Sequence, residues 1–245
     1  LFAGQAELGS NDKGRFALYW SQPTPGKVTS MALPETDMAD TSTGPSGEPA
    51  NAWFTCPRTS LKPCVIEPYF YMIDGQNVLM TSIVFPLMVN GKVIASLSVD
   101  INLNSLQAVS QGASKKLYDG QTNVSIISPA GLLAGYSPDA SKLSQRLDAV
   151  DKTSGAELIR LLAASSKTAS LHSQQQLKVL SPFQPIPDGK SWGVLLDVPE
   201  KVLIGPAEAL KKQLDESNTA GTLVELGLGV LAALIGLLLV WLMAR

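Results

Sequence analysis

Apolar and polar residues alternate along two neighbouring stretches in the way that a pair of β-strands requires. The first stretch, NVLMTSIVFPLMV at 77–89, is rich in β-branched and aromatic residues, and the second, KVIASLSVDI at 92–101, alternates between two faces. Asn90-Gly91 separates the two stretches and is a strong signal for a tight turn. The pattern therefore predicts an antiparallel hairpin.

One acidic residue stands near the end of this hairpin. Asp100 falls on the more polar face of the second strand, among serines. The residues that follow, 102–117, predict a short helix, which Asn102 or Asn104 would cap.

A second unit with a similar pattern begins near residue 118. Strands are predicted within 122–138, around a Pro-Ala-Gly turn, and at 170–186 and 190–200, and helices at 137–147 and 155–165. Each unit is a small antiparallel sheet with helical insertions, so the predicted fold class is α+β. Residues 23–50, rich in proline and glycine, predict a long irregular loop before the first unit's hairpin.

The last part of the chain predicts a membrane segment. A polar helix at 206–219 leads into residues 226–244, which carry no charge and are long enough to cross a bilayer as a helix. Trp241 and Arg245 lie where interfacial residues belong, and Arg245 places the cytoplasm beyond the span. The start at Leu1, without an initiator methionine or signal peptide, predicts a piece of a longer membrane protein.

Composition and motifs argue against nucleic-acid binding and catalysis. The net charge of −2 and the pI near 5.5 do not fit a nucleic-acid binder. His172 is the single histidine, and no cluster has metal-ligand spacing. Residues 188–191, DGKS, end like a phosphate-binding loop, but Gln184 stands where that loop needs glycine. The sequence predicts neither an enzyme nor a cofactor.

The two cysteines are close together in the sequence. Cys56 and Cys64 enclose a short segment that contains two prolines. In an oxidising compartment we expect them to form a disulfide, which would stabilise the fold by roughly 2–3 kcal/mol. Two free buried thiols are the alternative.

Aromatic residues flank the cysteines on both sides. Trp53 and Phe54 precede them, while Tyr69 and Tyr71 follow at a spacing that puts both tyrosines on one face of a strand. Apolar ligand pockets are lined in this way, and plain core packing is the alternative, which we favour for Phe54. The tyrosines and Trp53 also carry polar groups that burial must satisfy, and Asp100 would accept N–H groups of a ligand.

These residues resemble the double Cache family, the extracytoplasmic sensor of bacterial chemoreceptors and other membrane sensors. The matching pieces are GRFALYW (14–20), AWFTCP (52–57), EPYFYMIDGQNVLMTS (67–82) and GKVIASLSVDINLNSLQ (91–107). The resemblance implies two PAS-like antiparallel-sheet modules on a long N-terminal helix that precedes this chain, followed by a transmembrane helix. It divides the chain into a membrane-distal ligand-binding module (1–117), a membrane-proximal module (118–204), a juxtamembrane helix (205–225) and the span (226–244).

The resemblance also implies where a ligand binds. The family's pocket positions match Trp53, Phe54, Tyr69, Tyr71 and Asp100 in this sequence. Amino-acid sensors of the family carry an arginine where this chain has Asn51, and an aspartate where it has Tyr71. Both departures weaken an amino-acid ligand, and the second also weakens a simple amine. The remaining groups favour a flat, nitrogen-rich molecule such as a purine, with a polyamine or biogenic amine as the alternative.

We therefore expect a small-molecule sensor of a methyl-accepting chemotaxis receptor in a bacterial inner membrane. Residues 1–225 would be periplasmic, and the missing N-terminal helix would form a homodimer. The same sensor on a histidine kinase or a diguanylate cyclase is an alternative. An alternative of another class is a membrane-anchored adhesion or assembly module without a small ligand.

Overall fold

The computed structural model describes the chain except residues 1–2, 74 and 244–245, and it leaves out the side chains of residues 23, 217–225 and 232–243. The chain forms two compact units, Leu1–Val198 and Pro199–Arg245, which are described separately.

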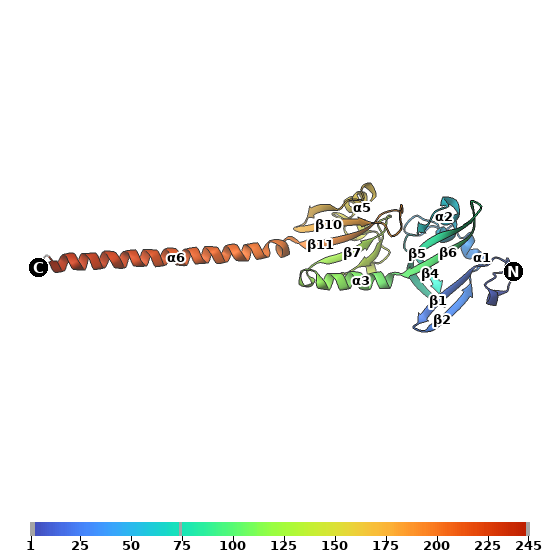
Figure 1. Ribbon diagram of the computed structural model, residues 1–245, viewed down its shortest axis with the longest axis horizontal. Helices are drawn as coiled ribbons and strands as arrows, with labels where there is room; N and C mark the ends of the chain where they lie inside the picture. The colour runs from blue at the N-terminus through green and yellow to red at the C-terminus, as the bar shows by residue number, and fades with distance from the viewer. Residues whose placement is uncertain (1–2, 74, 244–245) are drawn as a thin grey trace. The chain divides into compact units, whose positions relative to one another are not determined.

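The first sheet of the first unit is built around one long strand (Figure 1). Central strand β5 pairs along one edge with β6 and along the other with β4 and then β3, always antiparallel. The predicted hairpin of β5 and β6 is confirmed, and its turn residues Asn90 and Gly91 have the positive φ angles of 48° and 74°. The strands are β3 (Cys64–Val65), β4 (Tyr69–Ile73), β5 (Gln76–Val89) and β6 (Lys92–Asn102).

The region before this sheet is more regular than predicted. Residues 23–50 were expected to be an irregular loop, but strand β2 (Lys27–Ala32) pairs with β1 (Leu18–Thr24), and helix α1 (Glu35–Ala39) follows. The prediction was wrong there because Pro25-Gly26, with φ 82° at the glycine, closes a hairpin instead of ending a structured segment. A short 3-10 helix, η1 (Ala6–Leu8), precedes β1.

The aromatic residues before the cysteines lie on a helix that the sequence pattern did not reveal. Helix α2 (Ala52–Ser60) covers the first sheet, and Ala52 packs with Ile66 and Val84 in a buried cluster. The predicted disulfide is present and joins Cys56 of α2 to Cys64 of β3. It therefore fixes the helix to the edge of the sheet.

The second sheet has five antiparallel strands in the order β8-β7-β11-β10-β9. Helix 155–165 and the final strand are confirmed. One prediction was wrong: residues 170–186 form a hairpin of two strands, because Gln174 and Gln175 adopt φ angles of 52° and 60° in a two-residue turn. The elements are β7 (Asn123–Ile127), β8 (Leu133–Tyr136), α4 (Leu147–Val150), α5 (Gly155–Ala164), β9 (Ala169–Ser173), β10 (Gln176–Phe183) and β11 (Trp192–Pro199).

A second correction concerns the predicted helix at 137–147. Only one turn of 3-10 helix, η3 (Ala140–Lys142), forms there. The backbone then runs beside β8: the Leu133 N–H donates to the Gln145 carbonyl, and the Ser144 N–H donates to the Leu133 carbonyl. These hydrogen bonds to β8 replace the hydrogen bonds that a helix would form within residues 137–147.

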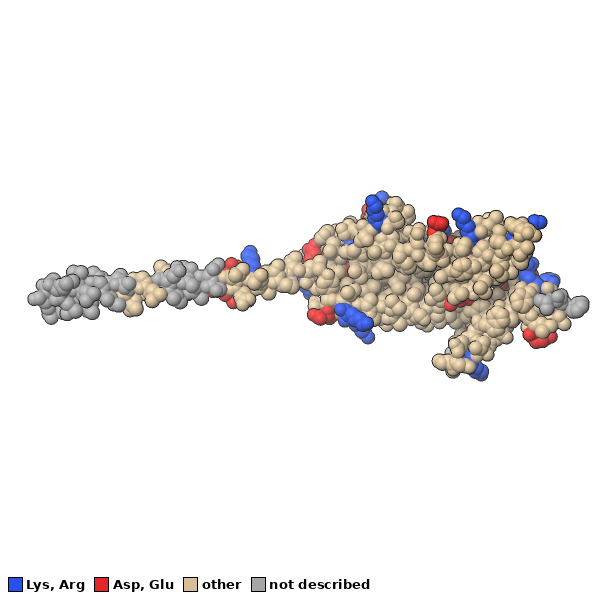
Figure 2. Space-filling view, in the orientation of Figure 1, with Lys and Arg blue, Asp and Glu red and all other residues tan. Residues whose placement is uncertain are grey.

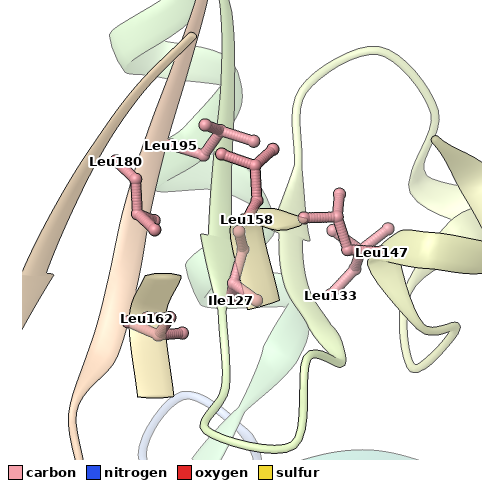
Figure 3. Close-up of a cluster of buried hydrophobic side chains, with 7 residues drawn as sticks. All are labelled: Ile127, Leu133, Leu147, Leu158, Leu162, Leu180 and Leu195. Carbon is pink, nitrogen blue, oxygen red and sulfur yellow. The ribbon is translucent and has the colours of Figure 1, made fainter. Parts of the chain in front are cut away.

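Leucine and isoleucine side chains fill the core between the second sheet and its helices (Figure 3). Each of them is at most 3% exposed. The cluster consists of Ile127, Leu133, Leu147, Leu158, Leu162, Leu180 and Leu195. These buried side chains explain why the strands of the second sheet show a regular apolar pattern in the sequence.

Helix α3 (Leu103–Lys116) follows β6 and packs on strands β7 and β8 of the second sheet. The predicted cap is confirmed, since the Asn102 side chain accepts the Asn104 N–H at 2.8 Å. Gln107 exchanges two hydrogen bonds with the backbone of Tyr136, at 2.7 and 2.8 Å. The division of the chain at residue 117 stays a prediction.

We expect Gly135→Ala to lower the free energy of unfolding by about 1–3 kcal/mol, a typical cost of overpacking. A Cβ atom at Gly135 would meet the Ser110 hydroxyl and lie 3.0 Å from the Leu106 carbonyl oxygen, so β8 and α3 would have to separate. Gly112→Ala is the control, because Gly112 lies on helix α3 itself and has open space around it. This control should raise stability by about 0.5–1 kcal/mol. Urea unfolding measures both, and equal stabilities would contradict the packing described.

The second unit is one long helix, α6 (Glu200–Met243), which includes the predicted polar helix at 206–219. Most of the predicted span at 226–244 lies outside the residues whose side chains are described. Among the residues that were described, no helix meets the length and hydropathy needed to cross a membrane.

Candidate functional site

Strand β4 presents its two tyrosines on one face, as predicted. Tyr69 and Tyr71 are half-buried, whereas the intervening Phe70 and the following Met72 are 54% and 56% exposed. The tyrosine face therefore points into the protein and the Phe70 face points to solvent.

Asp100 lies beside Tyr69 because of the register of the sheet. Asp100 on β6 is paired with Ser82 on β5, and the Ser82 hydroxyl lies 2.7 Å from the Tyr69 hydroxyl. The Ser98 hydroxyl donates to Asp100 at 2.9 Å, which confirms that this strand face is polar. Two of the predicted ligand-binding residues, Tyr69 and Asp100, are thus brought together.

A third tyrosine joins them from the β1–β2 hairpin. The ring centroids of Tyr19 and Tyr71 are 6.2 Å apart, a distance typical of interacting aromatic rings. The Tyr19 hydroxyl is also close enough to Asp100 for this carboxylate to raise the pKa of Tyr19, after burial as the larger cause. Tyr19 lies in the segment GRFALYW (14–20), which resembles the family, but it was not among the predicted ligand residues. The alternation of a strand is the only local signal there, and it does not distinguish Tyr19 from the adjacent Trp20 as a ligand residue.

A second carboxylate reaches the tyrosines from helix α1. The Tyr71 hydroxyl donates a 2.6 Å hydrogen bond to Asp37, a residue 34 positions earlier in the chain. Sequence reasoning missed Asp37 because it belongs to the segment that was expected to be irregular. We call the five residues Tyr19, Asp37, Tyr69, Tyr71 and Asp100 the tyrosine–carboxylate cluster.

Burial and negative charge keep all three tyrosines of the cluster protonated at neutral pH. Burial is the largest cause of the raised pKa of Tyr19, Tyr69 and Tyr71. The negative charge of Asp100 raises the pKa of Tyr19 and Tyr69 further, and the hydrogen bond to Asp37 does the same for Tyr71. The hydroxyls therefore remain donors, and the negative charge of the cluster resides on its two carboxylates.

Asn51 holds helix α1 in place. Its side chain is 4% exposed, and its amide donates to the carbonyl of Met38 at 2.8 Å. Its backbone N–H donates to the carbonyl of Asp40 at 3.0 Å. Its contacts thus support the end of the helix that carries Asp37, and the predicted place of Asn51 in the ligand site stays a prediction.

The start of helix α1 is fixed by an ion pair. Glu35 accepts two hydrogen bonds from the Arg15 guanidinium, both at 2.9 Å, and one from the Asn11 amide at 3.0 Å. The Arg15 bonds, followed by the Asn11 bond, hold the pKa of Glu35 below its ordinary value. The short helix that carries Asp37 is therefore fixed at both ends.

The two aromatic residues of α2 have different surroundings. Trp53 packs, like Tyr69, against the cluster of Ala52, Ile66 and Val84. Phe54 carries guanidinium groups on its ring instead, with Arg58 at 4.5 Å and Arg15 at 5.5 Å from the centroid. Trp53 thus borders the core under Tyr69, whereas the ring of Phe54 is occupied by cations of the protein itself.

Neither carboxylate of the tyrosine–carboxylate cluster has a cationic partner among the described residues. Asp37 accepts from Tyr71 and from Thr36, at 3.3 Å in the second case, and Asp100 accepts from Ser98 and lies near the Tyr19 hydroxyl. None of the ion pairs found in the described residues includes Asp37 or Asp100. The charged residues visible in Figure 2 are scattered over the surface. The arrangement can therefore bind a cation that also offers N–H donors.

The first unit thus contains two antiparallel sheets of four and five strands besides the β1–β2 hairpin, and the tyrosine–carboxylate cluster lies on the first of these sheets. No family model matches the chain. The methyl-accepting chemotaxis protein TlpQ of Pseudomonas aeruginosa is 54% identical over all 245 residues, which are 100% of this chain and 34% of that protein. The chain is thus similar to part of a methyl-accepting chemotaxis protein, a member of a non-enzymatic class of signalling receptors, and it spans about a third of this curated relative.

Solved structures share this fold. A methyl-accepting chemotaxis protein X is 25% identical with a TM-score of 0.58, and the match covers 80% of this chain and 67% of that one. The periplasmic sensory domain of the Campylobacter jejuni chemoreceptor Tlp1 is 12% identical with a TM-score of 0.62, covering 82% and 69%. The extracellular domain of the histidine kinase mmHK1S-Z3 is 17% identical with a TM-score of 0.64, covering 84% and 69%. The predicted α+β sensor fold is confirmed.

Proposed function

We propose that this chain is the ligand-sensing part of a transmembrane chemotaxis receptor and that it binds a small organic amine at the tyrosine–carboxylate cluster. The observation that carries the proposal is the presence of two carboxylates, Asp37 and Asp100, among three tyrosines and without a cationic partner in the described residues. A protonated amine supplies the missing positive charge.

An ammonium group suits both parts of the cluster. Its N–H groups form charge-assisted hydrogen bonds to carboxylates, which are about twice as strong as neutral ones. The faces of Tyr19 and Tyr71 attract a cation within about 6 Å of the ring centroid. An aromatic site with acidic residues is thus better matched to an amine than to a neutral or anionic metabolite.

The second carboxylate changes the choice of ligand that the sequence alone favoured. A purine was preferred because Tyr71 replaced an acidic residue and left Asp100 as the single carboxylate. Asp37 now supplies a second carboxylate at Tyr71 from another element. A neutral purine would leave both charges unpaired, which is costly in a partly buried site. An amino acid would bring a carboxylate as well, and Asn51 offers no positive charge where amino-acid sensors of the family carry an arginine, which disfavours an amino acid.

The location and the output follow from the relative. A sensor of a methyl-accepting chemotaxis protein would place residues 1–225 in the periplasm of a bacterium, with a homodimer formed through segments outside this chain. Ligand binding would shift the population of sensor conformations and pass the shift to α6 and the membrane. The histidine-kinase neighbour supports the fold alone, so the 54% identical chemotaxis protein favours a chemotaxis output.

Titration calorimetry with three ligands that share a four-carbon chain tests the amine proposal. We expect 1,4-diaminobutane to bind with measurable heat and to raise the melting temperature of the chain, since a ligand that binds only the folded state stabilises it. Butylamine should bind more weakly, because it satisfies one carboxylate, and 1,4-butanediol should not bind. Adenine and hypoxanthine complete the panel. Binding of a purine without binding of any amine would refute the amine proposal. If no compound of the panel binds, the tyrosine–carboxylate cluster is not a ligand site for these compounds and the proposal that it senses an amine is wrong.

A further inference from the structure

A cavity lies between the two sheets of the first unit, and no residue of the tyrosine–carboxylate cluster lines it. It has a volume of about 510 Å³. From the first sheet's side it is lined by Ser46, Glu48 and Glu67, and from the second sheet's side by Ala130, the end of helix α5 and residues 190–191. Any molecule in this cavity would contact both sheet modules.

Glu67 lies in the cavity wall, and one of its two carboxylate oxygens lacks a hydrogen-bond partner in the described part of the chain. It is 4% exposed, and one of its oxygens, Oε1, accepts the N–H of Ala130 at 2.9 Å. Its other oxygen, Oε2, has no hydrogen-bond partner of normal geometry among the described residues. A buried carboxylate oxygen without a donor is costly, which indicates that something in the cavity supplies one.

The other charges around the cavity add to its negative character. Glu48 accepts the backbone N–H of Glu67 at 3.2 Å, and the Lys190 ammonium lies 3.5 Å from the other Glu48 oxygen. Lys190 is 73% exposed and reaches from the rim, so it only partly offsets the two carboxylates. Helix α5 ends at Ala164 in the wall, where its last carbonyls carry partial negative charge.

The pKa of Glu67 agrees with this environment. Burial is the largest cause that raises the pKa of its carboxyl group, and the negative charge of Glu48 adds to it. Ser128, the Ala130 N–H and Lys190 act in the opposite direction but do not cancel the rise. A cation next to Oε2 would lower this pKa and keep the carboxylate ionised.

We propose that this cavity is a second binding site, for a small hydroxylated primary ammonium ion whose N–H groups bind Glu67 Oε2. The volume is much larger than a single metal ion needs, and no group of three or more metal-ligating side chains occurs in the part of the chain that the structure describes. Four serines of the wall offer hydroxyl groups that suit a hydroxylated ligand: Ser46, Ser165, Ser166 and Ser191.

A ligand in this cavity would affect the tyrosine–carboxylate cluster, because Glu67 and Tyr69 are only two positions apart in the sequence. Glu67 is followed by Pro68 and then by Tyr69, the first residue of β4 and a member of the tyrosine–carboxylate cluster. A ligand that ties Glu67 to Ala130 and α5 would fix the start of β4 relative to the second sheet. The second site would therefore adjust the transfer of the signal between the modules, whichever ligand the first site takes.

Ethanolamine is a suitable probe for the second site, and ethylene glycol is its neutral isostere. In calorimetry on the purified full chain, we expect ethanolamine to bind and ethylene glycol not to bind. Glu67→Gln keeps the acceptor for Ala130 but removes the charge, and it should weaken ethanolamine at least tenfold. Lys190→Gln removes the competing cation at the exposed rim and should tighten ethanolamine several-fold. Asp37→Asn combined with Asp100→Asn removes amine binding at the first site and should leave an ethanolamine site that Glu67→Gln then abolishes.

These variants separate the second site from the first. If the Asp37→Asn, Asp100→Asn pair abolishes ethanolamine binding while Glu67→Gln does not, ethanolamine binds only the first site and the proposal is wrong. Equal affinity in wild type and Lys190→Gln would also overturn it, and this variant stays informative even where Glu67→Gln fails to fold. Tighter binding of Ca²⁺ than of ethanolamine, lost in Glu67→Gln, would assign the cavity to an inorganic cation instead.

Discussion

Asp100→Asn and Asp37→Asn are each expected to weaken amine binding by about 30- to 150-fold, and the double variant by more than about 1,000-fold. Each substitution removes a charge-assisted hydrogen bond to the ligand, and such bonds contribute about 2–3 kcal/mol. Asparagine has nearly the same shape as aspartate, and its oxygen can still accept from Tyr71 or from Ser98. The loss would thus reflect charge rather than a changed fold. Calorimetry with 1,4-diaminobutane measures it.

The control for these variants is Asp12→Asn, an identical change at an exposed position of the same unit. It should leave the affinity within twofold, since exposed charges farther away are screened by salt. If Asp12→Asn weakens binding as much as Asp100→Asn does, the ligand responds to net charge only. In that case the tyrosine–carboxylate cluster is not the binding site. Unchanged affinity in the double variant would have the same meaning.

Lys178→Met is expected to lower the free energy of unfolding by about 3–5 kcal/mol at pH 7, as the loss of one partner of a buried ion pair does. The Lys178 side chain is 8% exposed and lies 2.7 Å from Asp197 and 3.3 Å from Asp151. Methionine fills a similar volume, so the cost comes mainly from two half-buried carboxylates left without their cation. Lys152→Met, at an exposed position, should cost less than about 0.5 kcal/mol.

The pH dependence of this loss has a defined sign. Burial lowers the pKa of Lys178, but the hydrogen bonds and charges of Asp197 and Asp151 outweigh burial and raise it above its ordinary value. A folded-state pKa above the unfolded one means that this stabilisation is complete at neutral pH and is lost as the pH rises through the folded pKa. In Lys178→Met, the destabilisation relative to wild type should therefore shrink as the pH rises through the folded-state pKa of Lys178. Urea unfolding at pH 7 and at alkaline pH measures both values. The same loss at both pH values would contradict the ion-pair explanation.

Local patterns predicted much of the first sheet. Alternation and Asn90-Gly91 located β5 and β6 to within one residue, and the same period of two put Tyr69 and Tyr71 on one face. These features depend on neighbours along the chain or across one turn. The disulfide between Cys56 and Cys64 was predictable for the same reason.

The other half of the cluster depends on contacts between distant segments. Asp37 meets Tyr71 across 34 positions, and Tyr19 meets it from a hairpin whose turn was taken for an irregular loop. Neither contact leaves a periodic signal in the sequence. Helix α2 was also missed, because Pro57 and the aromatic residues around it favour other structures locally, whereas packing on the sheet and the disulfide favour the helix.

Asn51 makes a structural contact that its sequence position does not reveal. It stands where amino-acid sensors of the family have an arginine, and this change predicts the loss of a ligand contact. In the structure its buried amide binds the Met38 carbonyl and so supports the helix that carries Asp37. The same substitution thus removes a group that would hold a ligand carboxylate and helps to position a group that would hold an amine.

A crystal structure of the chain with 1,4-diaminobutane bound tests the central claim most directly. The amine proposal predicts electron density for the diamine in contact with the tyrosine–carboxylate cluster. One nitrogen should lie within hydrogen-bonding distance, about 2.7–3.0 Å, of a carboxylate oxygen of Asp37 or Asp100, with its chain against Tyr19 or Tyr71. A diamine bound elsewhere, with both aspartates retaining only their contacts to protein hydroxyls, would contradict the proposal.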